Sequence, residues 1–576
     1  MYAAQLKDIR FTLDHMVDAG KLEQTELFAE AGVETRDAVL TEAGKLCEGA
    51  LAPLNRVGDL QGSRLENGVV RTPDGFKEAY AEIAGGGWVA MAASPEHGGM
   101  GLPLTYQSAV NEMMSSACLS ISLNPLMTQG HIEALEAHAS PELQRIYLPK
   151  LLSGEWTGTM NLTEPQAGSD VGALSTRAVP NGDGTYAITG GKIWISWGDH
   201  DMARNVSHLV LARLPDAPPG VKGISLFIVP KLIPDADGEP GARNDLKVVS
   251  LDHKLGLHAS PTCVMAYEGA TGWLVGEENK GLACMFTMMN NARLGVGLEG
   301  IGVAEAACQK ALAFALERKQ GRTPVTDGAG TIIDHADVRR MLIAMKAQTL
   351  AARAIAFDCA LHLDLARAAA TEEARSEAAA MAAFLTPITK AFGTDTGNEV
   401  AHMGVQVHGG MGFVEETGAA QFSRDVRVTA IYEGTNGIQA MDLVGRKLSM
   451  DGGRTALDYI ARCATIAESL AADERLRAAG EAVAAAASKA RGVTQWMLEA
   501  DQNDRNAGGA AYLRMMALLA GASYLGRGAL SSGDAARIEI ARFFAATQLP
   551  QAHAQAQAAT QGAGTLYALT PDDLVA

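Results

Sequence analysis

The stretch from Arg424 to Gln439 reads RDVRVTAIYEGTNGIQ and is the most informative part of the chain about its fold. Its first half reads as an extended, strand-like run, and a tight turn follows at Glu433-Gly434. A helix is expected from Thr435 onward. A lone Glu at this place has a plain structural explanation, because a first-turn carboxylate suits the positive end of a helix. The other segments of the chain favour a chemical role for it.

Length and composition predict a helical, multidomain protein. At 576 residues the chain is too long for a single hydrophobic core, and about three or four domains are expected. Hydrophobic residues make up 47% and aromatic residues only 5%, and Ala is abundant, which favours helices packed closely through small side chains. The formal net charge of −18 argues against a protein that holds nucleic acid.

The cysteines and the N-terminus predict a soluble cytoplasmic protein. The seven cysteines are scattered, odd in number and nowhere form Cys-x-x-Cys, so neither a disulfide framework nor a zinc site is expected. The first residues lack the apolar core of a signal peptide, and no apolar run of about 18 residues occurs. No membrane span is therefore predicted.

Hydrophobic periodicity changes along the chain and divides it into four predicted domains. Short β-branched runs bounded by turn residues predict a β domain in the middle of the chain, and three-and-four apolar spacing predicts helices before and after it. Helices are expected at about 282–319, 334–366, 371–390 and 396–407. The fold class is α+β, mainly α, with an N-terminal helical domain at 1–158, a middle β domain at 159–277, a helical bundle at 278–450 and an extra C-terminal helical domain at 455–576.

Four further segments have compositions that suit a binding site. MNLTEPQAGSD at 160–170 is a turn-rich entry to the β domain whose small residues let backbone approach a flat ring. KIWIS at 192–196 predicts a strand that buries Ile193 and Ile195 and places Trp194 and Ser196 on the other face. QVHGGMGF at 406–413 is a helix end followed by a glycine nest, which presents N–H groups to phosphate oxygens.

The predicted long helix carries the fourth segment and one misleading motif. Arg293 and Arg318 lie on it or at its end, within NNAR and ERK. Gly295-Val-Gly-Leu-Glu-Gly300 has the spacing of a dinucleotide fingerprint, but no strand precedes it, so small residues for close helix packing explain it better.

These segments and Ile431-Tyr-Glu-Gly-Thr435 together resemble the acyl-CoA dehydrogenase family, in the same order along the chain. The resemblance implies the fold of that family, with a four-helix bundle at 278–450, and FAD as cofactor. The implied cofactor-binding residues are Met160, Leu162, Thr163, Gly168, Ser169, Trp194, Ile195, Ser196, Arg318, Gln406, Gly409, Gly410 and Thr435. The implied substrate-binding residues are Ser169, Asn290, Arg293 and Gly434.

The resemblance further implies α,β-dehydrogenation of an acyl-CoA thioester, with Glu433 as the base that removes the α-proton. Some members place the base on the long helix, where this chain has Ala292, which supports Glu433. The extra C-terminal domain is similar to that of long members of the 3-methylmercaptopropionyl-CoA dehydrogenase type. A short or medium acyl-CoA or 3-methylmercaptopropionyl-CoA is the expected substrate, electron-transfer flavoprotein the expected acceptor, and a homodimer the expected assembly.

Two other functions remain open at this point. An acyl-CoA oxidase would use the same scaffold with oxygen as acceptor. An alkylation-response type of flavoprotein would bind DNA through a basic C-terminal domain. Residues 451–576 contain 11 Lys/Arg against 13 Asp/Glu, which provides no electrostatic footprint for DNA.

Overall fold

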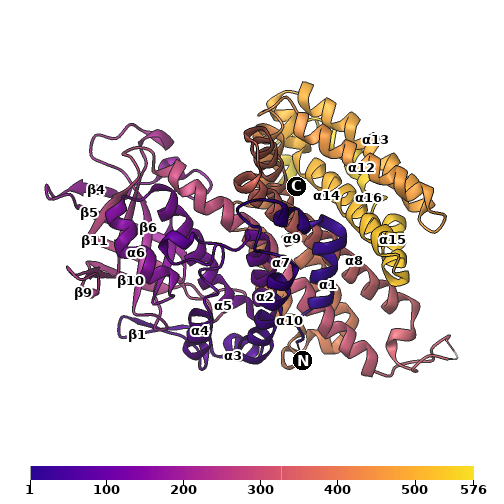
Figure 1. The fold of residues 1–576 in the computed structure, drawn as a ribbon, viewed down its shortest axis with the longest axis horizontal. Coiled ribbons are helices and arrows are strands. Elements are labelled where there is room, and N and C mark those ends of the chain that lie inside the picture. The colour runs from indigo at the N-terminus through magenta and orange to yellow at the C-terminus, as the bar shows by residue number, and fades with distance from the viewer. Residues whose placement is uncertain (1, 326, 576) are drawn as a thin grey trace. The chain divides into compact units, whose positions relative to one another are not determined.

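The computed structural model describes residues 2–325 and 327–575, and of Asn290 it describes only the backbone (Figure 1). The chain forms two compact units. Unit 1 comprises Met1–Thr41, Pro103–Glu112 and Arg293–Ala576, and unit 2 comprises Glu42–Leu102 and Met113–Ala292. None of the helices in the described ranges combines the length and the hydropathy needed to cross a membrane.

Unit 2 contains a seven-stranded sheet in the order β3-β6-β7-β11-β5-β4, with β10 paired to β11. The β3–β6 pair is parallel and the other pairs are antiparallel. Its strands are β3 (Trp156–Asn161), β4 (Arg177–Pro180), β5 (Tyr186–Ser196), β6 (Asn205–Ala212), β7 (Ser225–Pro230), β10 (Leu246–Leu251) and β11 (Thr262–Val275). Side chains such as Ile188, Phe227 and Tyr267 form the core against this sheet. Strands β5, β6, β7, β10 and β11 thus lie where the β-branched runs predict them, whereas β3 and β4 were not predicted.

Two small hairpins complete the β structure of unit 2. β1 (Arg64–Glu66) pairs with β2 (Val69–Arg71), and β8 (Leu232–Pro234) pairs with β9 (Pro240–Arg243). The first hairpin lies in a region predicted to be helical throughout, so that prediction was wrong here. Asn67 and Gly68 both have positive φ and form a turn of the kind that closes antiparallel hairpins, which overrides the helical pattern around them.

Helices make up most of the remaining chain. In the first half they are α1 (Leu6–Phe11), α2 (Val33–Leu46), α3 (Leu54–Gln61), α4 (Phe76–Gly85), α5 (Leu104–His138), α6 (Pro141–Leu152) and α7 (Gly281–Glu317). In the second half they are α8 (Ala336–Ala368), α9 (Glu372–His408), α10 (Ala419–Val426), α11 (Asn436–Asp442), α12 (Arg454–Ala472), α13 (Arg477–Glu499), α14 (Gln502–Ser532), α15 (Ala535–Thr547), α16 (Gln551–Ala559) and α17 (Pro571–Val575). Short helical turns connect them: η1 (Thr12–Val17), η2 (Ala19–Gln24), η3 (Cys47–Leu51), η4 (Pro95–His97), η5 (Val171–Ala173), η6 (Gly220–Gly223), η7 (Ile332–Asp334), η8 (Gly409–Phe413), η9 (Glu415–Thr417), η10 (Arg427–Ala430) and η11 (Leu443–Lys447).

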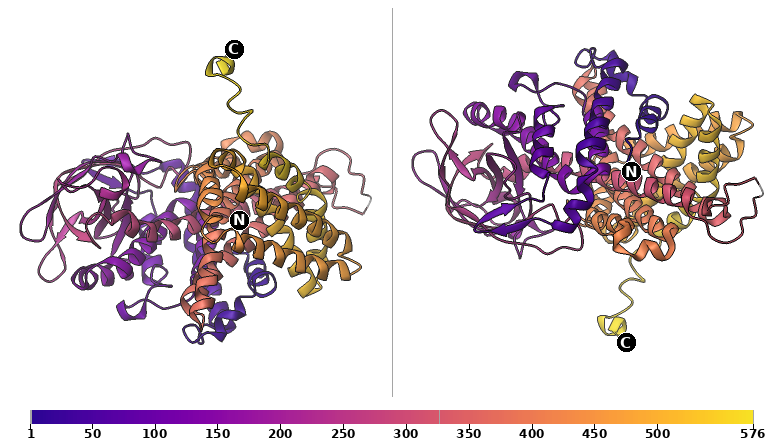
Figure 2. Two further views of the ribbon diagram at one scale, coloured as in Figure 1. Left: turned by 90° about the horizontal axis from the view of Figure 1, so that it is seen from above. Right: turned by 90° about the horizontal axis from the view of Figure 1, so that it is seen from below.

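In unit 1, α8 packs against both α9 and α14. The two helices predicted at 371–390 and 396–407 are one continuous helix, α9, because the small and polar residues between them are buried rather than in a loop. The C-terminal helices bury amphipathic faces, as α12 does with Ala456, Tyr459, Cys463 and Leu470. Figure 2 shows α17 standing away from the other C-terminal helices, and its residues are exposed.

Helices α7 and α9 approach closely at glycines. A Cβ on Gly300 would lie 2.4 Å from the carbonyl oxygen of Gly393, and one on Gly297 would lie 2.8 Å from the carbonyl oxygen of Thr389. These glycines belong to the motif with dinucleotide-fingerprint spacing. Close helix packing, the explanation preferred from the sequence, is confirmed.

The stretch from Arg424 to Gln439 differs from its prediction in its first half. It is helical in α10 and η10 rather than extended, and Gln421, Asp425 and Val426 are buried on its inner face. The β-branched residues here pack a short amphipathic helix, so tertiary burial outweighs their strand preference. The second half agrees with the prediction, since Thr435 caps α11 by accepting a hydrogen bond from the Ile438 N–H.

Candidate active site

Glu433 lies in the short loop between η10 and α11, at a strained backbone position. Its φ is +54°, a left-handed conformation that residues other than glycine rarely adopt, and Gly434 follows with φ +84°. Strained residues of this kind persist only where the surrounding structure holds them, and they cluster at functional sites. The turn predicted here is therefore present, directly before α11.

The loop is held by side chains from α9 and α11. Lys390 Nζ donates hydrogen bonds of 2.9 Å to the Gly434 carbonyl oxygen and to Asn436 Oδ1. Gln439 Nε2 donates to the Glu433 carbonyl oxygen at 3.1 Å. Within the described part of the chain, the Glu433 backbone N–H has no backbone or side-chain acceptor, so it is available to a bound group.

The electrostatic surroundings place the Glu433 carboxyl near the protonation midpoint at neutral pH. Burial raises the pKa of Glu433 to about 7, and the positive charges of Arg293 and Lys390 oppose that rise. Burial likewise lowers the pKa of Lys390 to about 8, although the charge of Glu433 works against this. Arg293 is buried and pairs with Asp442 Oδ2 at 3.5 Å. A carboxyl group poised in this way suits a general base.

A second carboxyl group lies next to this loop. Glu299 on α7 accepts a hydrogen bond from the hydroxyl of Tyr432, the residue directly before Glu433. Sequence reasoning assigned no role to Glu299 or Lys390. A charged side chain within an apolar helical run is the only signal that could have indicated them.

In unit 2, the turn-rich segment predicted to lie along a flat ring is fixed to strand β5. Lys192 Nζ contacts the Leu162 carbonyl oxygen at 3.0 Å and Glu164 Oε1 at 2.8 Å, and both side chains of this ion pair are buried. The Ile193 N–H donates to the Thr163 carbonyl oxygen at 2.9 Å. The structure thus brings Leu162 and Thr163 beside the KIWIS strand, through a Lys–Glu pair that the sequence analysis did not single out.

Strand β5 is irregular at Trp194. This residue has φ +60°, and two residues of β5 lie opposite one residue of β11 between Lys192 and Ile195. The bulge leaves the Trp194 indole 63% exposed and Ser196 half-buried, and Ile195 is buried as predicted. The prediction that Ile193 is buried was wrong, because the bulge shifts the alternation and Lys192 takes the buried position.

The other predicted cofactor residues of unit 2 lie at or near the surface. Met160 is half-buried near the end of β3, and Gly168 and Ser169 are exposed in the turn that follows. Asn290 lies on α7, and its side chain falls outside the described part of the structure.

In unit 1, the end of α7 and the glycine nest after α9 are neighbours. The ring of Phe314 stacks on His408 with centroids 4.5 Å apart. Arg318, Gln406, Gly409 and Gly410 are all exposed, and Gly409 has φ +59°. A Cβ at Gly409 or Gly410 would meet no atom within 4 Å, so the space beside this turn is open, while the Gly409 N–H itself donates to the Gln406 carbonyl oxygen.

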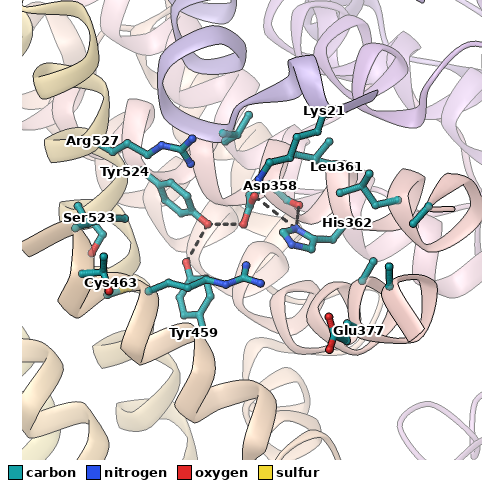
Figure 3. A pocket seen from close by; sticks show the side chains of 18 residues that line it. Lys21, Asp358, Leu361, His362, Glu377, Tyr459, Cys463, Ser523, Tyr524 and Arg527 are labelled. Carbon is teal, nitrogen blue, oxygen red and sulfur yellow. Dashed lines mark hydrogen bonds and ion pairs between the residues drawn. The ribbon is translucent and has the colours of Figure 1, made fainter. Parts of the chain in front are cut away.

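A cavity of about 570 Å³ lies elsewhere in unit 1 and contains none of the predicted site residues (Figure 3). Among its lining residues, the Tyr459 hydroxyl donates to the Tyr524 hydroxyl at 3.0 Å, and Tyr524 donates to Asp358 Oδ2 at 2.5 Å. His362 also approaches Asp358 (Figure 3). These contacts join the C-terminal helices α12 and α14 to α8.

Sequence comparison gives the class of protein. Four family models match successive parts of the chain: "Acyl-CoA dehydrogenase, N-terminal domain" at residues 36–155, "middle domain" at 159–270, "C-terminal domain" at 279–448, and "Acetyl-CoA dehydrogenase C-terminal like" at 460–570. The chain belongs to the acyl-CoA dehydrogenase family of oxidoreductases, in a long form with an additional C-terminal domain. The predicted family and fold class are confirmed.

Comparison with individual proteins identifies more specific relatives. The chain is 47% identical over 579 aligned residues to 3-methylmercaptopropionyl-CoA dehydrogenase of Ruegeria pomeroyi, covering 96% of this chain and 97% of that protein. Its fold is similar to that of Caenorhabditis elegans ACDH-11 in complex with C11-CoA, with TM-score 0.79 and 22% identity over 93% of this chain and 91% of the other. It is also similar to an acyl-CoA dehydrogenase from Bacillus anthracis complexed with FAD, with TM-score 0.74 and 21% identity over 95% and 90% of the two chains.

Proposed function

We propose that this protein is an FAD-dependent acyl-CoA dehydrogenase in which Glu433 removes the α-proton of an acyl-CoA thioester. The observation that carries the proposal is the Glu433 carboxyl itself, which sits at a strained loop position with a pKa of about 7 between Arg293 and Lys390. A thioester α-proton is weakly acidic, so its removal needs a positioned base and donors for the developing oxygen charge. The Glu433 N–H, which has no acceptor among the residues that the structure describes, is such a donor.

The residues of the chain fit FAD as the cofactor. The exposed Trp194 indole offers a flat apolar face, and the neighbouring Ile193 N–H bonds the Thr163 carbonyl oxygen; the exposed turn at Gly409 and Gly410 leaves space for a phosphate. Leu162, Thr163, Ser196 and Thr435 would contact the flavin, and Arg318, Gln406 and the nest would contact the pyrophosphate. When bound, FAD supplies the acceptor for the β-hydrogen, which leaves as hydride.

Substrate positioning falls to residues around the base. Arg293 is held by Asp442 near the Glu433 loop, and one buried nitrogen of its guanidinium, Nε, has no partner among the described residues. Gly434 directly follows the base in the chain, and Ser169 and Asn290 are the other proposed substrate-binding residues. An acyl chain bound beside Glu433 would displace water and raise the pKa of Glu433 further.

The proposed substrate is 3-methylmercaptopropionyl-CoA, with a short or medium acyl-CoA as the alternative. The 47% identity to the Ruegeria pomeroyi enzyme over nearly the whole of both chains supports this choice. Anaerobic addition of 3-methylmercaptopropionyl-, butyryl- and octanoyl-CoA to the FAD-loaded protein tests it. The first is expected to bleach the flavin absorbance fastest, and a flavin that stays oxidised with every thioester would contradict the proposed function.

The role of Glu433 has its own test. Glu433→Gln keeps the shape of the side chain but cannot accept a proton, so flavin reduction should slow by about 10²–10⁴-fold while FAD and acyl-CoA still bind. Glu499→Gln, an exposed carboxylate at the end of α13, is the matched control and should reduce normally. Normal turnover by Glu433→Gln would exclude it as the base.

Electron-transfer flavoprotein is the proposed acceptor. Reoxidation of the reduced protein by electron-transfer flavoprotein and slow reoxidation by oxygen would support a dehydrogenase, and the reverse would indicate an oxidase. The proposed assembly is a homodimer, because the C-terminal helices α12 and α14 pack against α9 and α8 within unit 1 and would cover a face through which shorter members of the family pair. A tetrameric mass in solution would contradict it.

A further inference from the structure

Glu299 is a buried carboxylic acid whose only hydrogen-bond donor among the described residues is part of the catalytic loop. Its side chain is 1% exposed, and one of its oxygens, Oε2, accepts from the Tyr432 hydroxyl. The other oxygen, Oε1, is buried with no partner in the described part of the chain. A bare buried carboxylate without a second donor is costly, so this environment favours the protonated form.

The charged groups that face Glu299 do not remove that cost. From the loop it faces Tyr432 and the negative charge of Glu433, and from α9 it faces Lys390. Lys390 directs hydrogen bonds to Gly434 and Asn436 instead, and Asp395 on α9 offsets its charge. On its own helix, α7, the cation Arg293 pairs with Asp442.

The shift in the pKa of Glu299 agrees with this geometry. The pKa of Glu299 is raised to about 8, mainly by burial and in smaller part by the charge of Glu433. The Tyr432 hydrogen bond and the charge of Lys390 act in the opposite direction but are smaller influences. Two negative charges on the neighbouring carboxyls of Glu299 and Glu433 would repel each other. Protonation of Glu299 therefore favours the ionised form of Glu433.

We propose that Glu299 is a positioning residue that stays protonated beside Glu433 at neutral pH, holds the catalytic loop through Tyr432, and limits the pair of carboxyls to one negative charge. The proposal rests on Glu433 as the base. Ionisation of Glu299 at alkaline pH would add a negative charge next to the place where the thioester oxygen gains charge. The α-proton step should therefore slow as the pH rises through the titration of Glu299.

Glu299→Gln is the direct test, because the amide is neutral at every pH and its oxygen still accepts from Tyr432. The rate of anaerobic flavin reduction by saturating acyl-CoA is measured between about pH 6 and 10. The wild-type rate should fall on the alkaline side, and Glu299→Gln should lose this fall while its rate near pH 7 stays within about threefold of wild type. A uniform loss of rate at all pH values would indicate a purely structural role and would overturn the proposal.

Tyr432→Phe provides a second test, because it should raise the pKa of Glu299 rather than remove the titration. Its hydroxyl lowers the pKa of Glu299, so without it the alkaline fall should move to higher pH rather than disappear. Glu468→Gln, an exposed carboxylate on α12, is the matched control and should keep the wild-type profile. An unchanged alkaline fall in both Glu299→Gln and Tyr432→Phe would exclude Glu299 as its source.

An infrared difference spectrum between wild type and Glu299→Gln tests the protonation of Glu299 independently of the proposed dehydrogenase activity. The FAD-loaded wild-type protein at about pH 7 should show a protonated carboxylic acid C=O band that is missing in Glu299→Gln. This readout needs no turnover, so it holds even if no thioester reduces the flavin. Absence of a band that depends on Glu299 would overturn the proposal while leaving Glu433 as the proposed base.

Discussion

Arg353 on α8 and Glu112 on α5 form an ion pair inside unit 1 in which both side chains are buried. Arg353 Nη2 lies 2.6 Å from Glu112 Oε1, and its Nε lies 2.8 Å from the same oxygen. Glu305 on α7 completes the group, 2.8 Å from Arg353 Nη2. One guanidinium thus joins three helices that are far apart in the sequence, and it neutralises two carboxylates that burial would otherwise penalise.

Removing Arg353 should destabilise the protein strongly. Arg353→Met leaves Glu112 and Glu305 buried without their shared cation, and the free energy of unfolding should fall by about 3–5 kcal/mol. Urea unfolding monitored by circular dichroism measures this. Arg542→Met, which removes an exposed pair with Glu539, is the control and should change stability by less than about 1 kcal/mol. Equal small losses in both variants would contradict the argument.

Lys390→Met should weaken the proposed base at neutral pH. The Lys390 cation lowers the pKa of Glu433, so without it the pKa of Glu433 rises above about 7 and more of the carboxyl is protonated. Flavin reduction near pH 7 should slow by about 3–10-fold and recover at higher pH. The pH profile of reduction checks this, with the exposed Lys489→Met on α13 as control. A slower rate without a shifted profile would assign Lys390 only to holding the loop.

Three buried histidines of unit 2 should make the protein sensitive to acid. Burial lowers the pKa of His131 to about 4 and those of His200 and His208 to about 3. Below about pH 6.5 the unfolded chain takes up protons that the folded chain refuses, so each histidine removes about 1.4 kcal/mol of stability per pH unit as the pH falls toward its folded pKa. Unfolding in urea between about pH 7 and 4.5 measures the slope.

The variant His208→Gln measures the contribution of one of these histidines to acid sensitivity. His208→Gln should be less stable at pH 7, because His208 Nδ1 bonds Thr159 Oγ1 at 2.7 Å, but its stability should depend less steeply on pH. His553→Gln on α16 replaces an exposed histidine and should keep the wild-type slope. Identical slopes in all three proteins would show that His208 is not a source of acid sensitivity.

Tyr524→Phe should loosen the C-terminal helices. The variant removes the hydroxyl that donates to Asp358 and accepts from Tyr459, and it leaves both buried groups without that partner. A loss of about 1–3 kcal/mol is expected, measured by thermal or urea unfolding. Tyr567→Phe, whose hydroxyl bonds Asn503 at an exposed position, is the matched control and should have little effect.

Two glycine substitutions should change stability in opposite directions. Gly300→Ala places a Cβ 2.4 Å from the Gly393 carbonyl oxygen and forces α7 and α9 apart, so stability should fall by more than about 1 kcal/mol. Gly492→Ala on α13 meets no atom within 4 Å and should stabilise the helix by about 0.5–1 kcal/mol. Stabilisation by both would show that the α7–α9 contact tolerates separation.

Local patterns predicted much of the secondary structure because they depend on neighbours in the sequence. β-branched runs identified most strands of the large sheet in unit 2, and Thr435 identified the start of α11. The predictions failed where tertiary contacts outweighed local preference. Burial made Val426 and its neighbours helical, and the bulge at Trp194 moved Lys192 into the interior in place of Ile193.

The sequence by itself determined the family, the order of the helical and β segments, and the Glu433 turn as the place to look for a base, since each depends on residues that are adjacent along the chain. Only the tertiary structure decided which distant groups surround that carboxyl. Lys390 and Glu299 come from α9 and α7, and the strained φ of Glu433 is a property of the folded loop. The physical reason is that a carboxyl's pKa depends on burial and on charges a few ångströms away, which the linear order of residues does not specify.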